Sequence, residues 1–186
     1  VQRVLEMDPE NINGHVLAAR IYLEQDKPVE ARDHLATALE QNPQCSPANY
    51  FLGVLSERFK DHQEALEHYD KAWSDDPQND VYLLAVLETL VTLGRVPEAL
   101  EIIVKQVDQF KRNAAIYLVA GDIFTQMGQF AEALAAYQNS HRINPSNVRV
   151  KESLAYANHR MGYARKALAL FRELESEYDP DREDAS

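Results

Sequence analysis

The sequence is short of cysteine, of basic residues and of long apolar runs. Its single cysteine, Cys45, permits no internal disulfide and fits a reducing compartment. No run approaches the roughly 18 consecutive apolar residues of a transmembrane helix, so we expect no membrane contact from this segment. Lysine and arginine number 19 against 30 aspartates and glutamates. The resulting net charge of −11 repels phosphate backbones, and we therefore expect no nucleic-acid partner.

Patterns that mark catalytic or metal sites are also missing. The sequence has no glycine-rich phosphate loop and no Gly-x-Ser-x-Gly motif. Its six histidines are scattered, and the nearest two, His62 and His68, are six residues apart, on different sides of a helix. The many carboxylates follow helix surfaces, where pairing with basic residues four positions away accounts for them. The sequence thus predicts that the chain is not an enzyme and has no catalytic residue, no metal site and no cofactor.

A period of 34 residues runs through the chain. Alanine keeps it without a gap, and proline, glycine and asparagine share it: Ala31, Ala65, Ala99, Ala133 and Ala167; Pro9, Pro43, Pro77 and Pro145; Gly94, Gly128 and Gly162; Asn11, Asn79, Asn113 and Asn147. Four independent columns at one period indicate a repeat protein.

Each repeat is predicted to form two helices, because its apolar residues recur at intervals of three and four. The glycine column ends the first helix, and the residue before each proline ends the second. Asp26 and Lys60 occupy the glycine column in the first two repeats and should each cost about 1 kcal/mol or less relative to glycine. In the second repeat Cys45 replaces the capping asparagine, so Ser46 is predicted to be the N-cap and Pro47 the first helical residue.

This arrangement resembles the tetratricopeptide repeat (TPR) family over residues 12–181. The second and fourth repeats carry the likeness most clearly: Leu52, Gly53, Ala65, Tyr69, Ala72 and Pro77; Tyr117, Ala120, Gly121, Phe124, Ala133, Tyr137 and Pro145. A small residue on the first helix is expected to lie against the alanine column of the second. Residues of the column Leu35, Tyr69, Ile103, Tyr137 and Phe171 are expected to fill the space beside them. The resemblance implies an all-α fold, a right-handed α–α superhelix (solenoid) with first helices on its concave face.

The predicted organisation follows the period: 1–11, a second-helix remnant of a preceding repeat; 12–45, 46–79, 80–113, 114–147 and 148–181, repeats one to five; and 182–186, an acidic tail. The third repeat diverges, with Leu87 for the small residue and Lys111 for the proline. We expect a looser helix pair there and a second helix that runs on toward Arg112. The half-repeat at Val1 suggests a fragment of a longer protein, in which an upstream signal would be invisible. With that proviso, a cytoplasmic location is favoured.

The concave face implied by the resemblance contains an apolar column with a charged rim, the usual composition of a peptide-binding groove. The predicted groove residues are Val16, Arg20, Tyr50, Val54, Val81, Leu84, Glu88, Leu118, Asp122 and Tyr156. The alternative is that superhelix curvature or a neighbouring repeat buries them, and for Leu118 the two interpretations are equally weighted.

Two ligand modes known in the resembled family do not match. The carboxylate clamp of its chaperone-tail binders is absent apart from Arg20, and residues such as Leu17, Phe51 and Ala85 replace the asparagine ladder of its sugar-transferring members. An apolar or amphipathic segment of another protein is therefore the expected partner. Two alternatives stay open: a homo-oligomerisation module, and an arm of a larger enzyme whose catalytic domain lies elsewhere.

Overall fold

The computed structural model describes residues 2–106, 109 and 112–178. All regular secondary structure within these residues is helical, which confirms the expected all-α class. The described helices are α1 (Gln2–Met7), α2 (Ile12–Glu24), α3 (Pro28–Gln41), α4 (Ser46–Arg58), α5 (His62–Asp75), α6 (Asp80–Thr92), α7 (Val96–Gln106), α8 (Ala114–Gln126), α9 (Phe130–Ile143), α10 (Val148–Arg160) and α11 (Ala164–Tyr178).

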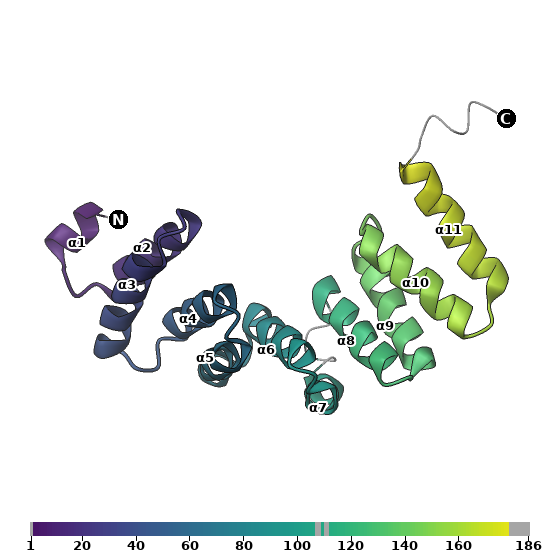
Figure 1. Cartoon of the computed structure of the whole chain (residues 1–186), viewed down its shortest axis with the longest axis horizontal. Helices are drawn as coiled ribbons and strands as arrows, with labels where there is room; N and C mark the ends of the chain where they lie inside the picture. Colours follow the sequence, from purple (N-terminus) through teal and green to yellow (C-terminus); the bar gives the residue numbers. More distant parts are fainter. Residues whose placement is uncertain (1, 107–108, 110–111, 179–186) are drawn as a thin grey trace. The chain divides into compact units, whose positions relative to one another are not determined.

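The chain divides into two compact units, Val1–Gly94 and Arg95–Ser186. In unit 1, α2 packs on α3 and α4 on α5, α3 contacts α4, and α5 contacts α6 (Figure 1). In unit 2, α8 packs on α9 and α10 on α11, while α9 contacts α10 and α7 contacts α8. First helices of successive repeats also touch, α2 with α4 and α8 with α10. Each helix therefore contacts mainly its neighbours along the chain, as in repeat proteins.

Local sequence explains where the helices begin and end. The four column asparagines all accept a hydrogen bond from a backbone N–H of the helix that follows, for example Asn11 Oδ1 from Gly14 N at 2.8 Å. Gly94, Gly128 and Gly162 end first helices at positive φ angles of 73°, 73° and 79°. Asp26 and Lys60 adopt the same conformation at φ of 56° and 61°, as predicted.

Three expectations about local structure need correction or fall outside the described residues. The N-cap of α4 is Cys45 and not Ser46, because Cys45 has the extended backbone of its column (φ −71°, ψ 94°) although its side chain makes no capping bond. The expected run of α7 toward Arg112 crosses residues 107–108 and 110–111, outside the described residues, and Arg112 itself lies in a turn. The acidic tail 182–186 also lies outside them.

Two helix pairs, α4–α5 and α8–α9, are spaced by a glycine facing a tyrosine ring. A Cβ atom on Gly53 would lie 2.4 Å from Cε1 of Tyr69, and one on Gly121 would lie 2.3 Å from Cε1 of Tyr137. The glycine of each pair is therefore in contact with the tyrosine that was expected to fill the space beside it. Phe171, expected to be buried in the same role as these tyrosines, is 46% exposed because no described helix follows α11 to cover it.

Candidate functional site

Seven of the predicted groove residues lie on the first helices of unit 1, and we call this set the first-helix surface. Its members come from α2, α4 and α6: Val16, Arg20, Tyr50, Val54, Val81, Leu84 and Glu88. Val81 is the most exposed apolar member, with 48% of its surface accessible. Tyr50, Val54 and Leu84 are half-buried, so this chain's own side chains do not seal them. The surface thus presents apolar side chains to solvent beside the charged residues Arg20 and Glu88.

Tyr50 stands at the centre of an aromatic cluster that joins α4, α5 and α6. Its ring centroid lies 5.3 Å from those of Phe51 and Tyr82 and 5.6 Å from that of Tyr69. Aromatic pairs at such distances are each worth about 0.5–1.5 kcal/mol beyond the area that they bury. Three neighbouring rings thus hold Tyr50 in place while it stays half-buried on the first-helix surface.

Glu57 on α4 lies against the same cluster. The hydroxyl of the buried Tyr69 donates to its Oε2 at 2.9 Å. The Thr89 hydroxyl is 3.4 Å from its Oε1 but only 2.7 Å from the Ala85 carbonyl, and its single proton goes to that closer acceptor. Glu57 therefore has one strong hydrogen bond, from a residue that also spaces α4 and α5.

Two carboxylates act on the tyrosines of this cluster. Burial raises the pKa of Tyr50, and the Glu57 and Glu88 carboxylates raise it further. Burial and Glu57 likewise raise the pKa of Tyr69. Because Glu57 and Glu88 both act on Tyr50, the two carboxylates belong to one acidic region beside the apolar residues of the first-helix surface.

The three predicted groove residues of unit 2 have different surroundings. Leu118 is 7% exposed and belongs to a core cluster with Val150 and Leu154. Of the two interpretations of Leu118, burial by a neighbouring repeat is therefore the one that the structure supports, because α10 of the next repeat covers it. Asp122 and Tyr156 reach the surface, and Tyr156 is 43% exposed.

Asp122 links three helices of unit 2. Its Oδ1 accepts a hydrogen bond from the Tyr137 hydroxyl of α9 at 2.8 Å, and its Oδ2 pairs with Arg149 of α10 at 2.6 Å. The carboxylate is thus neutralised within the chain. Its role is visible only in three dimensions, since the sequence placed it in the groove rim without a partner.

Tyr156 belongs to an aromatic and arginine cluster on α9 and α10. The Arg160 guanidinium lies 4.1 Å from the Phe130 ring centroid and donates to the Tyr156 hydroxyl at 2.7 Å. Arginine stacked on a ring in this way is held by cation–π attraction. Phe130 was not among the predicted residues because it lies on a second helix.

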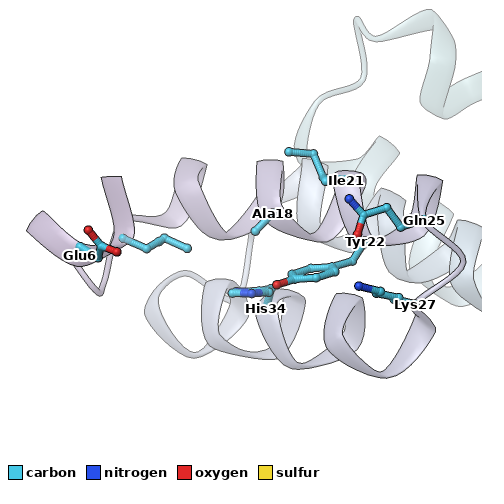
Figure 2. Close-up of a pocket in the computed structure, with 8 residues that line it drawn as sticks. Glu6, Ala18, Ile21, Tyr22, Gln25, Lys27 and His34 are labelled. Atoms are coloured by element: carbon cyan, nitrogen blue, oxygen red, sulfur yellow. The ribbon is translucent and has the colours of Figure 1, made fainter. Parts of the chain in front are cut away.

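Unit 1 also contains a pocket that the sequence did not indicate (Figure 2). Residues from α1, α2, α3 and the turn between the last two line it: Leu5, Glu6, Ala18, Ile21, Tyr22, Gln25, Lys27 and His34. The Tyr22 ring stacks on His34 with centroids 5.4 Å apart, and the Lys27 ammonium lies 5.8 Å from the same ring. The pocket is thus partly filled by its own aromatic pair.

The hydrogen bonds of His34 fix its tautomer. Nε2 of His15 lies 2.8 Å from the Pro9 carbonyl, which can only accept, so this nitrogen carries the proton of the neutral ring. His15 Nδ1 is then the acceptor, and His34 Nδ1, 2.8 Å away, must donate to it. In the neutral pair, His34 keeps its Nε2 lone pair on the other side of the ring.

Neither a metal site nor a membrane-spanning helix is found among the described residues. Among the residues that the structure describes, no three or more histidine, cysteine, aspartate or glutamate side chains are grouped as a metal site would require. None of the described helices is long and apolar enough to cross a membrane.

Comparison with known proteins places the chain among helical repeats. Family models described as "Tetratricopeptide repeat" match residues 16–80 and 58–122, and one described as "TPR repeat" matches residues 121–162. Anaphase-promoting complex subunit 3 of Schizosaccharomyces pombe is 25% identical over 130 residues, covering 68% of this chain and 19% of that protein. Human tetratricopeptide repeat protein 16 is 23% identical over 172 residues, covering 86% and 20%. The chain therefore spans about a fifth of the length of these relatives.

Solved structures show the same fold. YrrB, described as a TPR protein with an unusual peptide-binding site, superposes with a TM-score of 0.77 at 18% identity, covering 97% of this chain and 92% of YrrB. A chain of the anaphase-promoting complex hetero-tetramer Cut9–Hcn1 superposes with a TM-score of 0.75 at 16% identity, covering 93% of this chain and 35% of that one.

Proposed function

The chain belongs to the tetratricopeptide repeat family, and from this membership we propose that its first-helix surface binds an apolar or amphipathic segment of another protein. Repeats of this family generally serve as protein–protein interaction modules and are typically non-catalytic. The proposal concerns where this chain binds its partner and what the bound segment is made of.

One observation carries the proposal: on the first-helix surface Val81 is 48% exposed, and Tyr50, Val54 and Leu84 are only half-buried. Removing apolar surface from water contributes about 25 cal/mol per Å², before the costs of association. The aromatic contacts of Tyr50 hold part of this surface rigid, so a bound segment would not have to order it. Proposed binding residues in unit 1 are thus the seven members of the first-helix surface. In unit 2, Asp122 and Tyr156 remain proposed rim residues.

Membership of a larger protein complex is a second candidate, compatible with the first. The Schizosaccharomyces pombe relative is named as a subunit of the anaphase-promoting complex, and the Cut9–Hcn1 structure is named after the same complex. A segment of a neighbouring subunit would then be the bound partner.

The valine pair Val81 and Val29 allows a matched test. Both are the second residue of a helix, α6 and α3, and Val29 is 68% exposed on a second helix. Aspartate is tolerated near a helix N-terminus, so neither Val81→Asp nor Val29→Asp should unfold the chain. Peptides of 12 random residues displayed on phage are selected on the whole chain, synthesised and measured by fluorescence polarisation.

We expect Val81→Asp to raise the Kd of the selected peptides at least about tenfold and Val29→Asp to leave it unchanged. Equal binding by the two variants would refute the proposal. We also expect light scattering over a concentration series to show a monomer. A mass that grows with concentration and is restored to that of the monomer by Val81→Asp would favour self-association through the same surface.

A further inference from the structure

Each unit contains a hydrogen bond from a tyrosine hydroxyl to a carboxylate, and the two units differ in whether an arginine also pairs with that carboxylate. Tyr69 and Tyr137 are 68 residues apart, two periods, and each donates its hydroxyl to a carboxylate on the paired first helix: Tyr69 to Glu57 at 2.9 Å and Tyr137 to Asp122 at 2.8 Å. In unit 2 the carboxylate also receives Arg149, 2.6 Å away on the next first helix.

The residue of unit 1 equivalent to Arg149 is Val81. Both are the second residue of the following first helix, α6 or α10. The position of Asp122 is likewise taken by Val54, and the acidic residue of unit 1, Glu57, stands three residues further along its helix. The positions of the arginine–aspartate pair of unit 2 are therefore taken in unit 1 by two valines, and the carboxylate that the tyrosine contacts, Glu57, stands one helical turn after Val54 on α4.

No cation of the described chain neutralises Glu57. Within the described residues, Glu57 forms no ion pair with lysine or arginine. Arg58 is directed to Asp26 at 3.4 Å, and Arg20 lies 4.0 Å from Glu24. Burial is the larger cause of the raised pKa of Tyr50 and Tyr69, and the Glu57 and Glu88 carboxylates raise both pKa values further.

We propose that the segment bound on the first-helix surface carries a lysine or arginine that pairs with Glu57, next to an apolar residue that covers Val54 and Val81. The inference rests on the proposed function and adds the chemistry of the partner. The partner's cation would neutralise Glu57 in unit 1, as Arg149 neutralises Asp122 in unit 2. An ion pair beside buried apolar surface is less screened by solvent than one on an open surface, and it also sets the register of the bound segment.

The test is a double-mutant cycle between the chain and a selected peptide. Glu57→Gln removes the charge and keeps an acceptor for the Tyr69 hydroxyl, so the helix pair should stay intact by circular dichroism. Glu67→Gln, at an exposed position of α5, is the control that changes net charge equally. In the peptide, the lysine or arginine nearest its apolar residue is replaced by glutamine.

We expect the selected peptides to share a basic residue within a few positions of an apolar one. Glu57→Gln should raise the Kd of such a peptide about tenfold, and the peptide substitution should do the same. The two changes together should cost no more than either alone, whereas Glu67→Gln should leave the Kd unchanged.

Two results would overturn the inference in distinguishable ways. If selected peptides lack a basic residue, or bind Glu57→Gln as well as the parent chain, while Val81→Asp still abolishes their binding, the inference fails and the proposed function stands. If no selected peptide depends on Val81, the proposed function fails and this inference fails with it.

Discussion

The histidine pair of unit 1 shows how one residue's protonation can depend on another's. His15 and His34 share a single proton between their Nδ1 atoms, 2.8 Å apart, and the second nitrogen of His15 is committed to the Pro9 carbonyl. Burial and the neighbouring His15 lower the pKa of His34. A proton added to His34 would enter at Nε2, outside the Nδ1···Nδ1 contact, so its cost comes from burial and from the neighbouring His15 and not from the loss of that hydrogen bond.

This pair predicts a loss of stability in mild acid. Because the pKa of His34 is lower in the folded chain than its ordinary value of about 6.5, the unfolded chain binds more protons below that pH. The urea concentration at the midpoint of unfolding should therefore decrease as the pH is lowered from 7.5 to 5.5. His34→Gln should make this decrease smaller. His68, whose pKa is also lowered by burial, contributes to the slope that remains. An identical slope in the variant and the parent chain would contradict the prediction.

At the scale of helices, the spacing of each pair depends on two side chains that match in size. Gly53 and Gly121 face the tyrosines Tyr69 and Tyr137. At the same two columns the other repeats combine Ala19 with Leu35, Leu87 with Ile103, and Ala155 with Phe171. Glycine thus occurs in the two repeats whose second helix contributes a tyrosine at this column. The hydroxyl of that tyrosine passes the first helix to reach a carboxylate on it.

Gly53→Ala is predicted to destabilise the chain. Its Cβ would lie 2.4 Å from the Tyr69 ring, which is 2% exposed and has no room to move. Overpacking costs about 1–3 kcal/mol, and the better helix propensity of alanine offsets at most about 1 kcal/mol of it. Urea unfolding measures the difference, and adding Tyr69→Leu should recover part of it.

Gly14→Ala is the control for this prediction. Its Cβ would meet the end of the Leu5 side chain at 2.9 Å, which can turn away. We expect it to be neutral or stabilising, so an equal cost for Gly14→Ala and Gly53→Ala would rule out the packing argument.

At the scale of the whole molecule, stability is distributed among neighbouring helices. The two compact units divide between Gly94 and Arg95, inside the third repeat, where the sequence predicted a looser helix pair. Within each unit every helix packs mainly on those adjacent in the chain. Repeat proteins of this kind gain their stability from nearest-neighbour interfaces, and local changes remain local.

Hydrogen exchange should make this locality visible. In Gly53→Ala we expect faster amide exchange in α4 and α5, because the strained contact lies between these two helices. The adjoining α3 and α6 should show a smaller acceleration. Helices α10 and α11 should exchange at the parent rate. Acceleration spread evenly over all the described helices would show that the chain unfolds as one cooperative body.

The sequence by itself determined the period, the helix pairs and most of their ends, because asparagine caps, positive-φ glycines and prolines act within a few residues of where they stand. It also placed Val81 and Tyr50 on first helices, since the period puts equivalent residues on equivalent faces. What the tertiary structure decided is which side chains meet across helices. It buried Leu118 under α10, paired Asp122 with Arg149, joined His15 to His34 and left Glu57 without an ion-pair partner among the lysines and arginines that the structure describes. These outcomes depend on distances between residues 12 to 36 positions apart, and a repeat pattern aligns such residues without fixing the distances between them.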